Sequence, residues 1–119
     1  MKLSLPQSPL PLGSRGENQA RKLLKAKGYR FITQNFRCLI GEIDLVFQDG
    51  KQLVFVEVKT RTTDVRGHPE EAVTPHKIHK ITQVGEYFLK THPDLPHFAR
   101  IDVVAIEGKI LTHFQNITQ

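Results

Sequence analysis

Four charged residues with the chemistry of a metal-binding or acid–base site lie within one short segment, residues 41–61, GEIDLVFQDGKQLVFVEVKTR. They are Glu42, Asp44, Glu57 and Lys59. Carboxylate oxygens are ligands that Mg²⁺ and Mn²⁺ prefer, and a nearby lysine can neutralise developing negative charge. Most other residues of the segment are apolar, aromatic or β-branched, which is typical of strands. The helices and strands predicted around this segment must therefore position these four charged side chains.

A β-hairpin accounts for the spacing. Asp49-Gly50 is a strong turn signal between two strand-like runs. With these two residues as the loop, the facing pairs are Ile43 with Val56 and Leu45 with Val54. Side chains alternate across a strand, so these four residues share one apolar face that suits a core.

The other face of this predicted hairpin carries the charges. Glu42 lies opposite Glu57 and Asp44 opposite Phe55, which makes Asp44 and Glu57 diagonal neighbours with Cβ atoms roughly 5–8 Å apart. Lys59 lies on the same face. Like charges repel, and burial raises carboxylate pKa values. The cluster therefore requires compensation by the lysine or, more fully, by a divalent cation such as Mg²⁺ or Mn²⁺.

Two interpretations of this charged face remain open. The polar side of an edge hairpin is routinely solvated without any function. The run LVFVEV, residues 53–58, is however apolar on both faces before Glu57. That pattern indicates a central strand covered on both sides, where ionised carboxylates are costly unless they have a partner.

A helix is predicted on each side of the hairpin in the sequence. Ser14 is a good N-cap, Glu17 completes a capping box three residues later, and Gly28 ends the first helix. Thr74 caps a second helix with Pro75 at its first position. The apolar face of this second helix consists of Ile78, Ile81, Val84, Gly85, Phe88 and Leu89.

Further strands are predicted at residues 29–37 and, around a turn at 107–109, within residues 99–117. The resulting order is α-β-β-β-α-β-β. This order predicts an α/β fold in which helices pack on a mixed central sheet. Asp102 is expected to pair with Arg100 within the penultimate strand or to cap a local network there.

Composition limits the remaining choices. The chain has 119 residues and a net charge of +5, so it fits one domain with some preference for polyanions such as nucleic acid or anionic lipid. Residues 1–13 are proline-interrupted and predict a flexible arm, and residues 14–119 predict a single domain. The single Cys38 excludes an intrachain disulfide and favours the cytoplasm. No segment is long and apolar enough to span a membrane.

Several segments together resemble the YraN-like family of small bacterial proteins. That family lies within the PD-(D/E)XK nuclease superfamily, whose members are restriction-endonuclease-like and Holliday-junction-resolvase-like. The segments that carry the resemblance are GENQARKLL, NFR, GEIDLV, FVEVKTR, Gly67-His68-Pro69 and RIDVV, within residues 13–106. The resemblance implies a nuclease-like domain with an α-β-β-β-α-β core and, here, an extra C-terminal strand.

The resemblance also implies roles for individual residues. Asp44 and Glu57 match the metal-binding carboxylates, with the Val58 carbonyl as a further ligand, and Lys59 matches the catalytic lysine. Glu17 matches an acidic residue on the helix that is aimed at the metal, although its capping role alone also explains it. Ile43 stands where the superfamily signature has proline.

Basic residues near the predicted site are candidate phosphate contacts. Arg61 and Arg66 flank it in a loop, and Lys77 and Lys80 share one face of the second helix. The alternative is an ordinary solvated surface. His76 and His79 also have a spacing compatible with zinc, but no further ligand motif accompanies them.

Two functions follow from these expectations. The first is a Mg²⁺- or Mn²⁺-dependent endonuclease that hydrolyses phosphodiester bonds in DNA, such as branched or recombination and repair intermediates. The second is a non-catalytic nucleic-acid-binding or interaction module on a nuclease scaffold, because a fold does not by itself imply an activity. The protein is expected to be a monomer or a homodimer.

Overall fold

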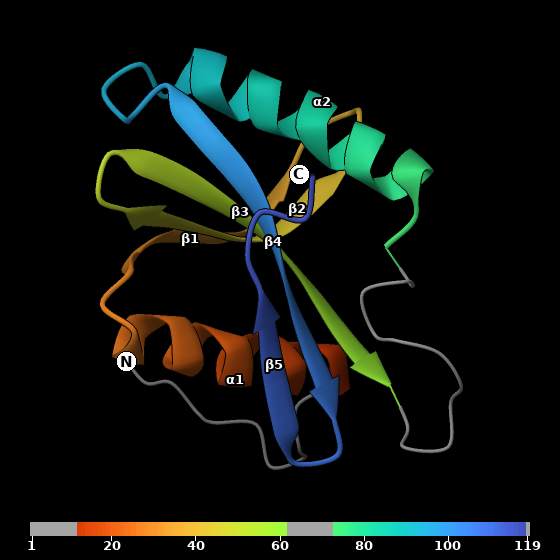
Figure 1. Cartoon of the computed structure of the whole chain (residues 1–119). Helices are drawn as coiled ribbons and strands as arrows, with labels where there is room; N and C mark the ends of the chain where they lie inside the picture. The colour runs from red at the N-terminus through yellow and green to blue at the C-terminus, as the bar shows by residue number, and fades with distance from the viewer. Residues whose placement is uncertain (1–11, 62–72, 119) are drawn as a thin grey trace, which may run out of the picture.

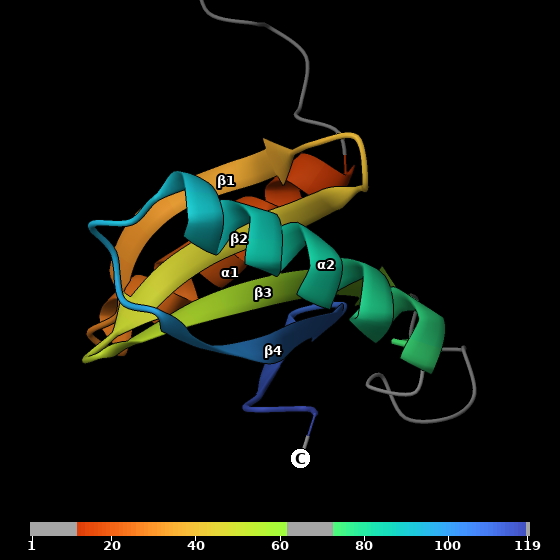
Figure 2. The same cartoon turned by 90° about the horizontal axis from the view of Figure 1, so that it is seen from above.

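Two helices cover opposite faces of a mixed β-sheet (Figures 1 and 2). The computed structural model describes residues 12–61 and 73–118. Its elements are α1 (Leu12–Ala26), β1 (Arg30–Arg37), β2 (Glu42–Asp49), β3 (Gln52–Arg61), α2 (Pro75–Thr91), β4 (Phe98–Glu107) and β5 (Ile110–Phe114). This order confirms the predicted α/β fold and is consistent with a restriction-endonuclease-like core followed by one more strand.

The strands of the described residues form one sheet in the order β1-β2-β3-β4-β5. Only the β3–β4 pair is parallel, because α2 carries the chain from the end of β3 back to the start of β4. The other neighbouring pairs are antiparallel. β3 is therefore a central strand with both faces covered, as its apolar run predicts.

The first helix begins earlier than predicted. α1 starts at Leu12, directly after Pro11 in the sequence, so Ser14 lies inside the helix and is not its N-cap. The capping-box explanation of Glu17 was therefore wrong. Of the predicted arm, residues 1–11 lie outside the described part of the chain, and residues 12 and 13 belong to α1. Gly28, with φ of 93°, follows the end of the helix as predicted.

The second helix confirms its sequence signals. Thr74 is the N-cap and Pro75 opens the helix, and the Lys77 N–H donates to Thr74 Oγ1 over 3.2 Å. The predicted apolar face is the buried one. At Gly85 α2 comes so close to the sheet that an added Cβ would lie 2.4 Å from the Phe55 ring.

The sheet separates two apolar clusters. On one face α1 packs against residues of β2, β3 and β4, including Ala20, Leu24, Leu45, Phe47, Val54 and Val56. On the other face α2 packs against a second cluster that includes Ile43, Val46, Leu53, Phe55, Ile81, Val84 and Phe88. No helix of the described residues has the length and apolarity required to cross a bilayer.

The predicted hairpin register was wrong by two residues. Asp49 pairs with Gln52, so the two-residue loop is Gly50-Lys51 and not Asp49-Gly50. Gly50 has φ of 62°, and glycine at the first central position is the usual choice for a type II′ turn. As a result, Leu45 faces Val56.

Ile43 also lies on the other face from the one predicted. It packs with the α2 cluster, whereas Leu45 packs with the α1 cluster, so alternation fails between them. On the neighbouring strand the pairs Gln34–Leu45 and Phe36–Ile43 flank Asn35, whose φ is 54°. The left-handed backbone at Asn35 turns the side chains that follow it in β1 toward the opposite face of the sheet. In the neighbouring strand β2, the side chains change face at Asp44, which lies beside Asn35.

Candidate functional site

Asp44 lies where the β2–β3 ladder stops. The last paired residues at this end are Leu45 and Val56. Beyond them the Val58 backbone N–H donates to Asp44 Oδ2 over 2.8 Å, so a side chain takes the place of the next ladder bond. The observed register makes Asp44 and Glu57 direct neighbours, and the predicted diagonal relation was wrong by the same two residues. The two carboxyl groups are joined by a hydrogen bond.

The pKa values of both carboxyl groups are raised. Burial and the nearby Asp44 charge raise the pKa of Glu57 to about 7, against the opposing effect of Lys59. Burial also raises the pKa of Asp44, although the hydrogen bonds from Val58 N–H and Glu57 act in the other direction. Glu57 is therefore the group of the pair that takes up a proton more readily, and its protonated carboxyl donates to Asp44.

Two lysines face this carboxyl pair. Lys59 follows Glu57 by two residues on β3, and Lys77 comes from the first turn of α2. A hydrogen bond with Lys77, together with burial and the Lys77 charge, lowers the pKa of Lys59, while the Glu57 and Asp44 charges oppose the shift. This hydrogen bond brings Lys77, which the sequence predicted only as a phosphate contact, into the centre of the cluster.

Glu17 approaches the pair from α1. Burial and the Asp44 charge raise its pKa, while a hydrogen bond from Asn35 opposes the rise. The Asn35 amide nitrogen, oriented to donate, lies 3.1 Å from Glu17 Oε1 and 3.3 Å from Glu42 Oε2. Gly16 allows this approach, because a Cβ there would lie 2.6 Å from Thr60 Oγ1 on β3.

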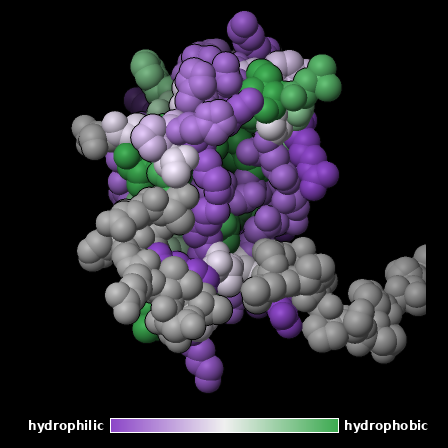
Figure 3. Space-filling model, turned by 90° about the vertical axis from the view of Figure 1, so that its right-hand side faces the viewer, coloured by the Kyte–Doolittle hydropathy of each residue, from purple (hydrophilic) through white to green (hydrophobic). Residues whose placement is uncertain are grey.

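The structure thus brings together most of the predicted site residues. Glu17, Asp44, Glu57 and Lys59 interact directly or through their charges. Glu42, Glu57, Lys77, Lys80 and Ile81 line a cavity of about 180 Å³ beside them. Figure 3 views the molecule from the side on which α2 begins and β3 ends, where hydrophilic side chains surround a hollow with hydrophobic atoms in its depth.

Of the two predicted loop arginines, Arg61 lies within the described residues. Arg61 Nε lies 3.3 Å from Glu107 Oε2, and its side chain is only 10% exposed. Arg61 at the end of β3 therefore forms an ion pair with Glu107 at the end of β4. Arg66 and Gly67-His68-Pro69 lie outside the described residues.

The side chains available as ligands decide whether the predicted metal ion fits this site. Within residues 12–61 and 73–118, no three His, Cys, Asp or Glu side chains are grouped as a metal site. Asp44 and Glu57 alone are in contact, and a protein commonly binds Mg²⁺ through one or two carboxylates together with water and substrate phosphate. The Asp44 charge that raises the pKa of Glu57 is one that a divalent cation would offset, so these two residues fit such an ion.

Two positioning residues were missed by the sequence reasoning. Asn35 orients Glu17 and Glu42, and its only sequence signal is an asparagine, which tolerates positive φ, inside a strand-like run. Gly16 lies in a helix interior, where glycine is costly and so indicates close packing.

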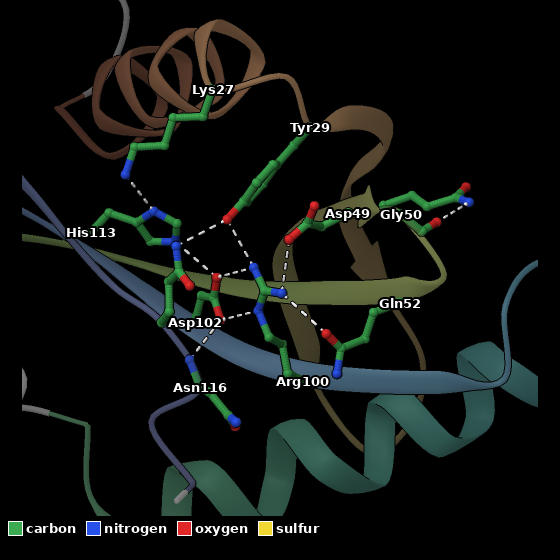
Figure 4. Close-up of polar contacts among 11 residues, drawn as sticks. Lys27, Tyr29, Asp49, Gly50, Gln52, Arg100, Asp102, His113 and Asn116 are labelled. Carbon is green, nitrogen blue, oxygen red and sulfur yellow. Dashed lines mark hydrogen bonds and ion pairs between the residues drawn. The ribbon is translucent and has the colours of Figure 1, made fainter.

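A second polar network joins β4, β5 and Asn116 to the segment between α1 and β1 and to the β2–β3 turn (Figure 4). Asp102 is fully buried and accepts hydrogen bonds from Arg100 Nε at 3.0 Å and His113 Nε2 at 2.8 Å. The Asn116 backbone N–H donates to the same carboxylate over 2.9 Å. The predicted Arg100–Asp102 pair is confirmed. Because these partners satisfy the carboxylate, the network stabilises the fold.

Comparison with known proteins agrees with the motifs. A UPF0102 protein of Geobacter sulfurreducens is 50% identical over 95 residues, covering 80% of this chain and 74% of that protein. UPF0102 proteins of Prosthecochloris aestuarii and Syntrophus aciditrophicus are 46% and 43% identical, covering 85% and 84% of this chain and 80% and 79% of those proteins. The model of the uncharacterised protein family UPF0102 matches residues 16–106. The chain therefore belongs to the UPF0102 family, as its YraN-like motifs predicted.

Proposed function

We propose that this protein is a metal-dependent endonuclease that hydrolyses phosphodiester bonds in DNA. The observation that carries the proposal is the contact between Asp44 and Glu57 with Lys59 beside it. Perturbed titratable groups of this kind cluster at functional sites. A purely structural role does not account for two carboxyl groups and two lysines gathered at the open end of a strand pair.

Asp44 and Glu57 are the residues that would hold Mg²⁺ or Mn²⁺, with Glu17 close enough to act on the ion through its charge. The ion would supply Lewis-acid activation of the phosphate and of a water nucleophile. The Val58 N–H fixes one Asp44 oxygen, so the orientation of this carboxylate is set before any ligand binds.

The lysines have separate roles in this proposal. Lys59 has a lowered pKa, so a larger fraction of its amine is unprotonated than in an ordinary lysine, and it is suited to orient the attacking water and take its proton. Lys77 and Lys80 extend from α2 beside the cavity and bind phosphate oxygens by charge. The net charge of +5 favours the approach of DNA as a whole.

One observation favours the second candidate, a non-catalytic DNA-binding module. The described residues contain no group of three metal-ligating side chains, and a hydrogen bond already joins the carboxyl groups of Asp44 and Glu57. Lys77 and Lys80 would still bind phosphate in such a module. The two candidates differ in whether a bond in DNA is broken.

The test incubates the protein with linear, flapped and four-way DNA in Mg²⁺, in Mn²⁺ and in chelator. We expect cleavage only with metal, and its loss in Asp44→Ala. Asp94→Ala, at an exposed position after α2, is the matched control and should cleave like the wild type. Binding of every DNA without cleavage supports the non-catalytic module, and cleavage that survives Asp44→Ala contradicts the assigned site.

A further inference from the structure

Three exposed apolar side chains meet beside the candidate site. Leu39 is 108% exposed and Ile40 is 40% exposed, both in the turn between β1 and β2, and Tyr87 of α2 is 45% exposed. With Arg37 and Cys38 they line a shallow cavity of about 520 Å³. These three residues are called the turn patch below. Hydrophobic surface of this kind is visible at the upper right of Figure 3, on the side from which the β1–β2 turn projects.

The fold holds the turn patch in place. The Cys38 N–H donates to the Gly41 carbonyl over 2.9 Å and closes the turn. A Cβ at Gly41 would lie 3.4 Å from Val84, so the turn rests against α2. Phe36, just before the turn, packs edge-on against Phe88 with ring centroids 4.9 Å apart. These contacts hold the backbone of the turn against α2, and the Leu39 side chain points from it into solvent.

The turn patch is continuous with the candidate site. Arg37, at its border, forms an ion pair with Glu42 over 3.2 Å, and Glu42 lines the cavity that contains Glu57 and Lys80. On α2, Lys80 and Tyr87 are seven residues apart, which places them on the same face about 10.5 Å from each other along the axis. That length corresponds to about three base-pair steps of 3.4 Å along DNA.

We propose that the turn patch is a wedge for DNA bases, with Leu39 inserting at a disrupted base step and Tyr87 stacking on an exposed base. The proposal deepens the nuclease function and rests on it. Apolar side chains are used in this way to separate bases, and aromatic rings stack on them whatever their identity. Insertion costs least where bases are already unpaired. The substrate class is therefore DNA with a branch or unpaired bases, and not continuous duplex.

Charge and size favour DNA over a second copy of the chain. Arg37 borders the turn patch and Lys80 lies two helical turns from it, so phosphates beside an inserted base would meet cations. A stable protein interface uses about 20–30 residues on each side. Even with Arg37 and Cys38 included, the cavity at the turn patch is lined by five residues, fewer than such an interface uses.

The test measures binding in chelator, so that it does not depend on cleavage. The probes are a four-way junction with 2-aminopurine beside the branch point and a continuous duplex of the same sequence. We expect Leu39→Ala to weaken junction binding about fivefold or more, as the loss of one base contact would do. It should lower the 2-aminopurine fluorescence gain and change duplex binding less than about twofold. Phe98→Ala is the control, since Phe98 is 76% exposed beside Gln52, at the opposite end of β3 from Glu57.

Three other outcomes would contradict the proposed role of the turn patch, each for a different reason. If Leu39→Ala binds the junction with wild-type affinity and fluorescence, the wedge is wrong, while nuclease function is judged separately by metal-dependent cleavage. If the wild type binds no DNA, both proposals fail. If Leu39→Glu converts a dimer into a monomer on gel filtration without changing DNA binding, the turn patch is a protein interface. Because Leu39 is fully exposed, these variants should melt at the wild-type temperature.

Discussion

At the residue scale, the central feature is the hydrogen-bonded contact between the Asp44 and Glu57 carboxyl groups. Sequence reasoning found these residues, because charges in a strand-like run are conspicuous. It could not find their direct contact, since the register depended on which residue takes the positive φ in the turn. It also missed Asn35, because a change of face within a strand is decided by packing on both sides and leaves only a weak local signal.

Replacing Glu57 with a residue that does not titrate should change how the free energy of unfolding depends on pH. Its folded pKa, about 7, is raised above the ordinary value of 4.5. The favourable contribution of its protonated form is therefore complete below about pH 4.5 and is lost as pH rises through 7. In chelator, Glu57→Gln should be more stable than the wild type at pH 8 by on the order of 2 kcal/mol and equal to it at pH 4.5.

Urea denaturation at the two pH values measures this difference. Glu86→Gln, at an exposed position on α2, is the control and should follow the wild type at both. An unchanged pH profile in Glu57→Gln would contradict the raised pKa of Glu57.

The same pair should make the protein respond to divalent metal. An ion that binds only the folded state raises its stability in proportion to RT ln(1 + [L]/Kd). At pH 8 we expect Mn²⁺ at about 100 times its Kd to stabilise the wild type by about 2.7 kcal/mol, and to have no such effect on Asp44→Asn. Thermal melting with and without chelator measures it, and equal stabilisation of both proteins would place the ion elsewhere.

At the element scale, α2 was predicted well and the hairpin less well. The helix has a cap, an initial proline and a clear apolar period, all of which are local signals. The hairpin register is set by the φ of Gly50, which the Asp-Gly dipeptide does not determine. The start of α1 was also misplaced, since Ser14 is a plausible cap by type and yet lies inside the helix.

Gly85 provides a test of how α2 sits on the sheet. Gly85→Ala gains about 1 kcal/mol of helix propensity, but its Cβ would collide with the buried Phe55 ring. Overpacking should dominate, with a net destabilisation of about 1–2 kcal/mol in denaturant titration. Adding Phe55→Leu should recover part of the loss. A stabilised Gly85→Ala would show that α2 does not approach the sheet as described.

At the scale of the whole molecule, the Asp102 network ties distant parts of the chain together (Figure 4). It links β4 with β5 through His113, and Lys27 after α1 lies 2.8 Å from His113 Nδ1. Sequence reasoning identified the Arg100 partner, which is two residues away. It could not identify His113 or Asn116, because their proximity depends on the sheet order.

This network should make the fold sensitive to acid. Burial alone would raise the pKa of Asp102, but hydrogen bonds from His113 and Arg100 and from the Asn116 N–H outweigh it and lower the pKa below 3.8. The stability gained is therefore present above about pH 4 and lost as pH falls through the lowered value. Asp102→Asn should destabilise the protein by about 3–5 kcal/mol at pH 7, because it leaves the largely buried Arg100 guanidinium without this anion.

Denaturant titration between pH 7 and pH 2 checks this prediction. Asp94→Asn, at an exposed site, is the control. An Asp102→Asn variant as stable as the wild type at pH 7, or with the same steep loss in acid, would show that the network contributes little.

The central claim is that Lys59, beside Asp44 and Glu57, takes part in breaking phosphodiester bonds. Its most direct measurement is the single-turnover rate of DNA cleavage in Mn²⁺ for the wild type, Lys59→Ala and the turn control Lys51→Ala. We predict a rate about 100-fold lower or more in Lys59→Ala, with unchanged DNA affinity and normal cleavage by Lys51→Ala. Cleavage by Lys59→Ala at the wild-type rate would contradict the account.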